Sequence, residues 1–259
     1  MKFTYEAYKN MILDLKENNY EIVDYKNYKA KEKAVILRHD VDFSLEKALE
    51  MAELESELNV SAIYFVLLST DFYNVASKKS IEIIKKIISL GGIIGLHFDE
   101  QKYQVKTKED LIEYVKYEAD ILSKIIGEKI EIVSMHRPSK KFLEMNLEIP
   151  EMINSYQKEF FENFKYVSDS RMNWRENIEE IISSNKYERL HILTHPFWYE
   201  EKEDTMKNKL EKFLENSVID RYHTLDDNLK DLESVISKEK IIKRRFINHI
   251  YNLEMKTER

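Results

Sequence analysis

Short apolar runs alternate with longer amphipathic segments along this 259-residue chain, and the alternation limits the folds it can adopt. The runs are short and rich in β-branched residues, which is typical of buried strands. The longer segments repeat apolar residues every three or four positions, as helices packed on a sheet do. Strands are predicted in 34–37, 62–68, 92–96, 130–135, 166–167 and 190–193, and helices in 45–58, 78–90, 108–126, 176–185 and 204–216. Alternating strands and helices pair in parallel, so we expect an α/β fold.

The ends of the chain add helices to this pattern. A further helix is expected near residues 4–18, and Ser44 is placed to cap the helix that begins at Leu45. No internal repeat or Pro/Ser-rich linker interrupts the chain, so we expect one domain over 1–259, with a core of about 34–225 and a helical tail of about 226–259. The basic segment Lys238–Arg259 is expected to pack on the core or on a second copy in a homo-oligomer, with an anionic membrane surface as the alternative.

Composition excludes several classes of protein. The formal net charge of -7 argues against a nucleic-acid partner, because phosphate binding requires clustered positive charge. The chain has no cysteine, so a metal site would have to use histidine and carboxylate. No apolar run approaches the roughly 20 residues that span a bilayer, so no transmembrane segment is expected. The polar N-terminus does not look like a signal peptide, and a cytoplasmic location is expected.

Residue types that bind metals or move protons follow the predicted strands. His39, His97, His136 and His195 each end an apolar run, and Asp169 ends another. Functional sites of parallel α/β folds lie at the carboxyl ends of the strands, so these side chains should meet at one rim. A single histidine of this kind is more often a hydrogen-bonded core residue, but four together indicate a site.

The segment Arg-His-Asp-Val-Asp at residues 38–42 carries the sharpest local signal. Side chains alternate faces along a strand, so Asp40 and Asp42 should project together with Arg38 behind them. Two adjacent carboxylates repel, and a divalent metal on one of them would relieve the repulsion and leave the other free as a base. The alternative is a solvated turn that caps the following helix.

A second signal surrounds His97. The glycines that precede it, at 91, 92 and 95, allow close backbone approach. Asp99 and Glu100 follow it directly, so an oxygen ligand could join the imidazole. Zinc binds both imidazole nitrogen and carboxylate oxygen, and in a catalytic zinc site one coordination position is taken by water.

Taken together over residues 34 to 198, these segments resemble the polysaccharide deacetylases, the NodB-homology or carbohydrate esterase 4 group. The likeness is greatest to a branch of bacterial glycan-biosynthesis proteins with an Arg-His-Asp-Val-Asp motif. It implies a distorted (β/α)7 barrel, here with extra N- and C-terminal helices. It also implies a role for each matching residue: Asp40 as base, Asp42 and His97 as metal ligands, Arg137 orienting the base, His195 as general acid, and Asp169 and Trp174 lining the pocket.

The chain departs from the family pattern at one ligand. The family's second motif is His-x-x-x-His, and Gln101 stands where its second histidine would be. His136, Asp99 or Glu100 could replace it, and His136 is preferred because it is an imidazole that ends a strand. The resemblance implies a divalent metal, zinc first, with cobalt or nickel as alternatives.

The function implied is hydrolysis of an N-acyl group, most simply acetyl, from an amino sugar in bacterial surface-glycan biosynthesis. A cytoplasmic enzyme would meet a small or carrier-linked sugar. Trp174 and Trp198, with Phe197 and Tyr199, are either a floor for the sugar ring or core packing. Two alternatives remain open. The first is opening of cyclic amides, or other C–N hydrolysis, with an atypical or absent metal. The second is a catalytically inactive sugar-binding protein.

Overall fold

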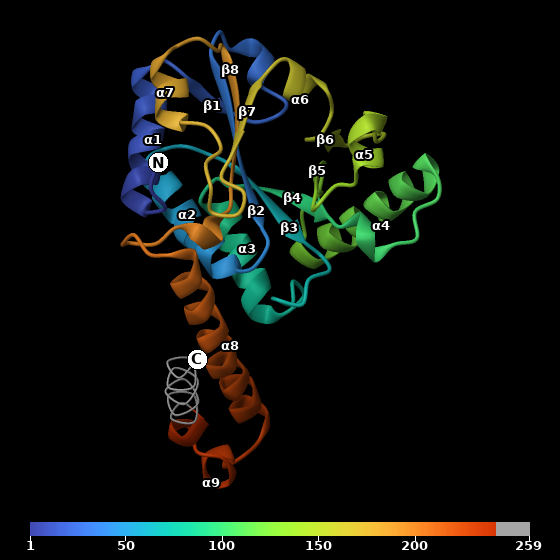
Figure 1. The fold of residues 1–259 in the computed structure, drawn as a ribbon. Helices are drawn as coiled ribbons and strands as arrows, with labels where there is room; N and C mark the ends of the chain where they lie inside the picture. Colours follow the sequence, from blue (N-terminus) through green and yellow to red (C-terminus); the bar gives the residue numbers. More distant parts are fainter. Residues whose placement is uncertain (242–259) are drawn as a thin grey trace, which may run out of the picture. The chain divides into compact units, whose positions relative to one another are not determined.

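The computed structural model describes residues 1–241, which form two compact units, one of Met1–Glu203 and one that begins at Asp204 (Figure 1). Each unit is treated by itself below. Residues 242–259, with most of the basic tail and His249, lie outside the described residues. The organisation as one domain over 1–259, with a core of 34–225, stays a prediction.

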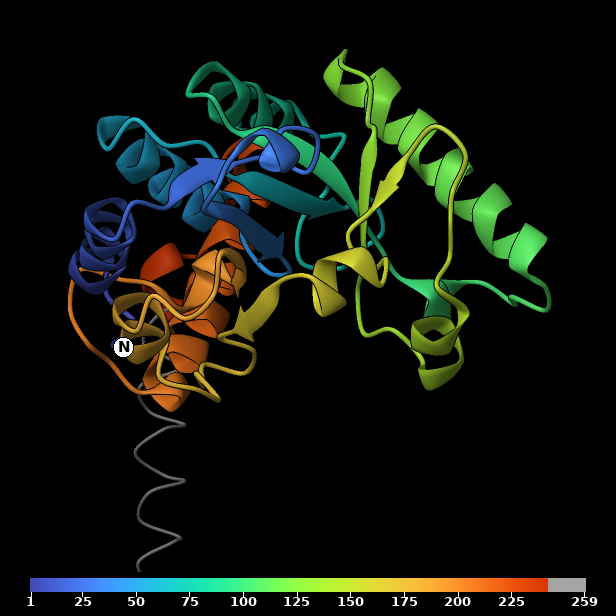
Figure 2. The same cartoon turned by 90° about the horizontal axis from the view of Figure 1, so that it is seen from above.

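The first unit is built on one sheet in which every strand pairing is parallel. Seven strands follow the order β6-β5-β4-β3-β2-β8-β7, and an eighth, β1, pairs with the first half of β2. The sheet curls into a half-barrel whose path ends at β6 and β7, which confirms the predicted distorted barrel (Figure 2). The strands are β1 Glu21–Val23, β2 Ala34–Val41, β3 Ile63–Leu67, β4 Ile93–Phe98, β5 Ile132–Met135, β6 Ile153–Asn154, β7 Lys165–Ser168 and β8 Arg189–Thr194.

Helices cover the outer side of this sheet. Five of them contact one another in the order α7, α1, α2, α3, α4, so they form a continuous layer around the strands (Figure 2). Thr4, Ser44, Ser77, Thr107 and Asn177 cap them, each accepting a backbone N–H, which satisfies donors that a helix start leaves free. The helices of this unit are α1 Tyr5–Glu17, α2 Leu45–Glu57, α3 Lys78–Ser89, α4 Lys108–Ile126, α5 Lys140–Met145, α6 Glu159–Glu162 and α7 Ile178–Ser183.

Strong sequence periodicity located most of these elements. The predicted strands and helices of the first unit match β2–β5, β7, β8, α1–α4 and α7, and Ser44 caps α2 as expected. The short elements β1, β6, α5 and α6 were missed. The two missed strands have three and two residues and the two missed helices six and four, and none of them has an apolar period clear enough to locate it.

Aromatic rings fill the interior of the half-barrel near the amino-terminal ends of its strands. Tyr25 and Tyr28 come from the segment before β2, and Phe160 and Phe164 from α6 and the segment after it. All four are buried and pack with Ala34, Ile36, Ile63, Phe65 and Ile132. This packing closes the amino-terminal end of the barrel, so polar side chains can meet near the carboxyl ends of the strands.

The second unit contains a long helix, α8 (Met206–Asn228), and a short one, α9 (Leu232–Val235). The helix predicted over 204–216 is therefore confirmed, but the observed helix continues to Asn228. Within residues 1–241, no helix combines the length and the apolar composition that crossing a bilayer requires.

Candidate metal and acid-base site

Strand β2 places the Arg-His-Asp-Val-Asp segment at the carboxyl-terminal end of the barrel strands. Asp40 is bonded by Arg38 and lies near His97, while His39 points the other way, into the helix layer. His39 contacts Thr194 through Nδ1 at 2.7 Å and Glu55 through Nε2 at 2.8 Å. The predicted alternation is therefore correct, and of the four strand-end histidines His39 is the one that belongs to the core.

Three side chains from different strand ends converge on one point. The imidazole atoms His97 Nε2 and His136 Nδ1 lie 3.2 Å apart, and each is 3.3 Å from Asp42 Oδ1. Asp42 Oδ1 is buried and has no hydrogen-bond partner among residues 1–241, although two ring nitrogens lie this close. The three atoms thus face a common centre, as donors around a cation do.

The size of this triangle fits a small divalent metal. A tetrahedral ion with ligand bonds of about 2.0–2.1 Å separates its ligand atoms by about 3.3–3.4 Å. The measured separations of 3.2, 3.3 and 3.3 Å match one face of such a tetrahedron. Two imidazoles and one carboxylate are also a donor set that zinc accepts, and the fourth position faces away from the triangle.

Of the three groups left open as the replacement ligand, His136 is the one that joins the cluster. Asp99 instead accepts from Arg137, and Glu100 accepts from the backbone N–H of Ser139. Gln101 is exposed in a short 3-10 helix, Glu100–Lys102. His136 continues the β5 ladder through a 2.8 Å hydrogen bond to Phe98 O, which fixes its direction.

Asp40 is paired with Arg38, and the predicted pair with Arg137 is wrong. Arg38 Nη2 lies 2.7 Å from Asp40 Oδ1 and 2.9 Å from Oδ2, with both side chains buried. The Arg137 side chain is 61% exposed and donates to Asp99 at 2.7 Å. The error has a conformational cause, because His136 and Arg137 follow the end of β5 and His136 takes the inward position. The positive φ of 49° at Arg137 bends the chain away from the barrel there.

His195 is held by Asp169 on the other side of the cluster. Asp169 Oδ1 accepts from the ring Nδ1 at 2.6 Å, and Oδ2 accepts from the His195 backbone N–H at 3.1 Å and the Tyr199 hydroxyl at 3.1 Å. His195 Nε2 then points toward Asp42, 3.9 Å from its Oδ2. Asp169 was predicted to bind substrate, but it is fully buried with both oxygens occupied, so it orients His195 instead.

These contacts set the charge states at the site. Burial alone would lower the pKa of His195, but the carboxylate of Asp169 raises it to about 9. Burial would raise the pKa of Asp42, and the imidazoles of His136 and His97 more than reverse this and hold it far below its usual range. The pKa of Asp40 is also lowered, because the Arg38 guanidinium outweighs the effect of burial. The site therefore holds two ionised carboxylates beside a protonated imidazole.

The predicted aromatic residues are partly packing. Trp198 is buried against the rings of Phe43 and Phe197, at centroid distances of 6.3 and 4.9 Å. Tyr199 is fully buried under Asp169. Trp174 is half-buried, and its buried indole N–H has no hydrogen-bond partner within residues 1–241. Substrate contacts of Trp174 and Trp198 stay predictions.

Sequence reasoning placed Arg38 behind the two aspartates but did not assign it to Asp40, and it missed the two serines that Arg38 bonds. Arg38 donates through Nη1 to Ser155 at 3.0 Å and through Nη2 to Ser134. Arg38 lies in the motif and two positions before Asp40, so its period-2 spacing could have identified it as the carboxylate's partner. Ser134 has the same spacing to His136, but nothing in the sequence links Ser155 to the site.

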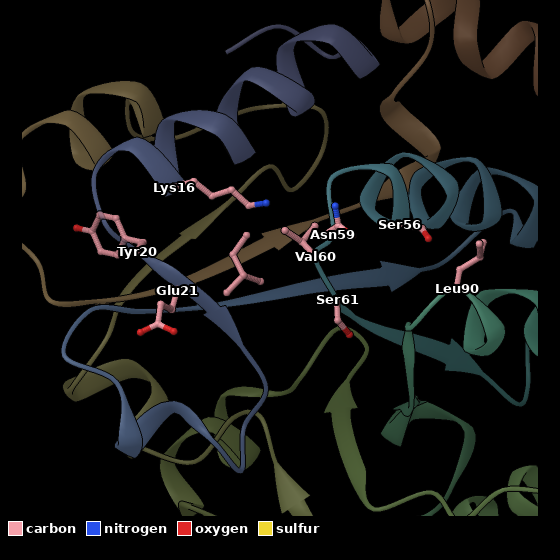
Figure 3. A pocket seen from close by; sticks show the side chains of 9 residues that line it. Lys16, Tyr20, Glu21, Ser56, Asn59, Val60, Ser61 and Leu90 are labelled. Carbon is pink, nitrogen blue, oxygen red and sulfur yellow. The ribbon is translucent and has the colours of Figure 1, made fainter.

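A hollow of about 560 Å³ lies at the opposite end of the barrel, between α1, β1, α2 and the start of β3 (Figure 3). Its charged side chains are engaged elsewhere: Lys16 donates to Leu58 O at 2.5 Å, and Glu21 pairs with Lys31 at 2.6 Å. The site chemistry therefore belongs to the carboxyl-end cluster.

The fold and the site define a class: a parallel α/β half-barrel with two imidazoles, two carboxylates and a carboxylate-bound histidine at its carboxyl-terminal rim. Solved structures similar to the chain include polysaccharide and peptidoglycan deacetylases, the group whose motifs the sequence resembles, and a pseudoenzyme of the CE4 family. No protein-family model and no curated protein matches the chain.

Three of these structures illustrate the similarity, which at these identities is one of fold. The peptidoglycan deacetylase PdaC from Bacillus subtilis is 14% identical, over 64% of this chain and 75% of that one, with a TM-score of 0.40. The deacetylase PplD from Streptococcus pyogenes, in complex with acetate, is 12% identical over 74% and 83%, with a TM-score of 0.44. A CE4 family pseudoenzyme from Bacillus anthracis is 12% identical over 71% and 59%, with a TM-score of 0.42, so the chain spans less than two thirds of its length.

Proposed function

We propose that the chain is a metal-dependent hydrolase that removes an N-acyl group, most simply acetyl, from an amino sugar. The observation that carries the proposal is the triangle of His97, His136 and Asp42, whose edges fit a metal, with Asp40 next to His97 and His195 next to Asp42. Asp40 Oδ2 lies 3.6 Å from His97 Nε2, and His195 Nε2 lies 3.9 Å from Asp42 Oδ2. A base and an acid therefore flank one ligand cluster.

His97, His136 and Asp42 would hold the ion, with zinc preferred and cobalt or nickel as alternatives. When bound, it would polarise the acyl oxygen and lower the pKa of a water molecule. Asp40 is placed to take the proton from that water as its oxygen attacks the acyl carbon. His195 is placed to give its proton to the amine nitrogen as the C–N bond breaks, leaving a carboxylate and an amine. Each proton transfer contributes about 100- to 10,000-fold to such reactions.

The residues around this pair suit those roles. Arg38 keeps Asp40 ionised, as a base must be. Asp169 fixes the ring of His195 so that Nε2 faces the cluster, and it stabilises the protonated form that an acid requires. Trp198 and Trp174, whose indole N–H has no hydrogen-bond partner among the described residues 1–241, are proposed contacts for the sugar. A cytoplasmic location, a carrier-linked substrate and a role in surface-glycan assembly remain predictions from the sequence.

Acetate release tests the proposal. Protein purified without chelator and loaded with zinc or cobalt is assayed on N-acetylglucosamine linked to a nucleoside diphosphate and on chitotriose. Asp40→Asn and His195→Ala are compared with Glu144→Gln, an exposed carboxylate in α5. We expect both site variants to lose at least about 100-fold in turnover and the control to lose none. Near wild-type turnover in either site variant would remove that residue's role.

A second assay separates the acid from the base. The leaving group of 4-nitrophenyl acetate departs without protonation, so His195→Ala should hydrolyse this ester far better than it hydrolyses the amide, whereas Asp40→Asn should fail on both. An inactive sugar-binding protein would instead bind the glycan and release no acetate. A cyclic-amide hydrolase would open a ring without any bound metal.

A further inference from the structure

Arg38 occupies an unusual place for a charged residue. Its side chain is completely buried in the barrel interior, at the level just below the metal cluster. Burying a guanidinium is costly unless it is paired and hydrogen-bonded, so an arginine at this depth indicates a specific task. Its partners identify the task.

The guanidinium, which comes from β2, joins a serine on β5 and a serine after β6 to a single carboxylate. Nη2 donates to both oxygens of Asp40, at 2.7 and 2.9 Å, and also to the hydroxyl of Ser134 on β5. Nη1 donates to Ser155, just after β6, at 3.0 Å. The two hydroxyls fix the plane of the guanidinium, and the guanidinium in turn fixes both oxygens of Asp40. This leaves the Asp40 carboxylate few orientations.

Packing removes the remaining freedom. The guanidinium carbon lies 4.9 Å from the centre of the Phe65 ring and 5.4 Å from that of Tyr156. Phe65 is itself pressed from the other side by β4, where a side-chain carbon on Gly95 would come within 2.6 Å of its ring. The absence of a side chain at Gly95 therefore sets the position of Phe65, and Phe65 supports Arg38.

From these contacts we infer that Arg38 is the positioning residue that holds the base Asp40 in its working orientation, a role that Arg137 does not share. The inference rests on the proposed function, in which Asp40 accepts the proton of the attacking water. Arg137 is on the outer side of the rim, exposed and bonded to Asp99. A change at Arg137 should therefore leave the orientation of Asp40 intact, and a change at Arg38 should not.

Arg38→Lys is the informative variant, because it keeps the charge that Asp40 needs while losing the planar fork. We expect kcat on the amide substrate to fall about 10- to 100-fold, with KM changed by less than about threefold, because the base is misplaced and the substrate contacts are not. Arg137→Lys tests the rival assignment, and Arg221→Lys, on the exposed face of α8, is the matched control. A larger fall in kcat for Arg137→Lys than for Arg38→Lys would overturn the inference.

A double variant separates positioning from general damage to the fold. In an Asp40→Asn background there is no base to orient, so adding Arg38→Lys should change kcat by less than about twofold. If the two losses multiplied in full, Arg38 would act independently of Asp40 and the inference would be wrong. The visible absorption of cobalt-loaded protein should be the same in Arg38→Lys and wild type, since the three ligands are unchanged.

A crystal structure of metal-loaded Arg38→Lys provides a readout that needs no activity. We expect the Asp40 carboxylate to rotate away from its wild-type position while Asp42, His97 and His136 stay in place. If the Asp40 carboxylate keeps its wild-type position without the Arg38 guanidinium, the inference is wrong, even if the chain hydrolyses no tested substrate. Absence of hydrolysis in the metal-loaded wild type, with Asp40 rotated in the variant, would instead refute the proposed function and leave the positioning role intact.

Discussion

His191 should make the fold sensitive to acid, independently of the site chemistry. The ring is completely buried on β8 among Tyr25, Phe160, Phe161, Phe164 and Tyr166. Its Nδ1 lies 3.3 Å from the carbonyl of Phe160 and its Nε2 lies 2.8 Å from the Tyr25 hydroxyl. Donation from Nδ1–H to the carbonyl leaves Nε2 to accept from the hydroxyl, so both nitrogens are satisfied in the neutral ring.

The size of the effect follows from the pKa. Burial, with the nearby positive charge of Arg38, lowers the pKa of His191 from 6.5 to about 3. The unfolded chain therefore binds more protons than the folded one between those values, and the free energy of unfolding falls as the pH falls through this window. At about 1.4 kcal/mol for each pH unit below 6.5, the loss is about 2 kcal/mol at pH 5 and about 3 kcal/mol at pH 4.

Urea unfolding at about pH 7.5 and about pH 5 measures this loss of unfolding free energy in wild type and in His191→Gln. The glutamine keeps a donor and an acceptor but does not titrate. The variant will be less stable at the higher pH, because it fills the aromatic cage poorly. The informative quantity is the pH dependence, which should shrink by about 2 kcal/mol in the variant. His223→Gln, at an exposed position on α8, is the control. Parallel losses of stability in wild type and His191→Gln would refute the reasoning.

Three further results are expected. His136→Ala should abolish stoichiometric metal binding and Gln101→Ala should preserve it, as read by metal analysis after dialysis. Gly95→Ala should lower the free energy of unfolding by about 1–3 kcal/mol, because its methyl group would meet the Phe65 ring at 2.6 Å; an unchanged urea midpoint would contradict this. Glu55→Ala should lower it by about 3–5 kcal/mol in the same assay, since it removes the buried carboxylate that two tyrosines and His39 share.

Much of the fold was predictable because long amphipathic helices and buried β-branched strands leave a clear period. The cluster was also predictable in outline, since histidines that end parallel strands must meet at one rim. The orientation of Arg137 could have been predicted as well: His136 and Arg137 end a predicted strand as consecutive residues, and side-chain alternation lets only one of them face the centre. The family resemblance favoured a role for Arg137 at the base, and the alternation of side chains overrides it.

Other features depend on contacts that no local pattern records. Ser155 follows a two-residue strand, β6, that exists because the sheet extends to it. The aromatic cluster of Tyr25, Tyr28, Phe160 and Phe164 joins segments more than 130 residues apart in the chain. A single aromatic residue in a loop carries no sequence signal of which residue it will contact. His39 is a similar case, because it ends an apolar run as the site histidines do. It differs only in that it alternates with Arg38 and Asp40 along β2, so its side chain points to the other face of the sheet, into the core.

The inward-facing residues of the strands form two layers, and this explains how one missing ligand can be replaced. The lower layer contains Arg38, Gly95 and Ser134, and the upper layer, two residues further along the same strands, contains Asp40, His97 and His136. In the lower layer, Arg38 donates to Asp40 above it and to Ser134 beside it, and Gly95 leaves room for the Phe65 ring that packs on Arg38. A ligand taken from residue 101 would lie in a short 3-10 helix outside this arrangement. A ligand at residue 136 directly follows β5, so its direction is set by the same sheet that positions Asp40.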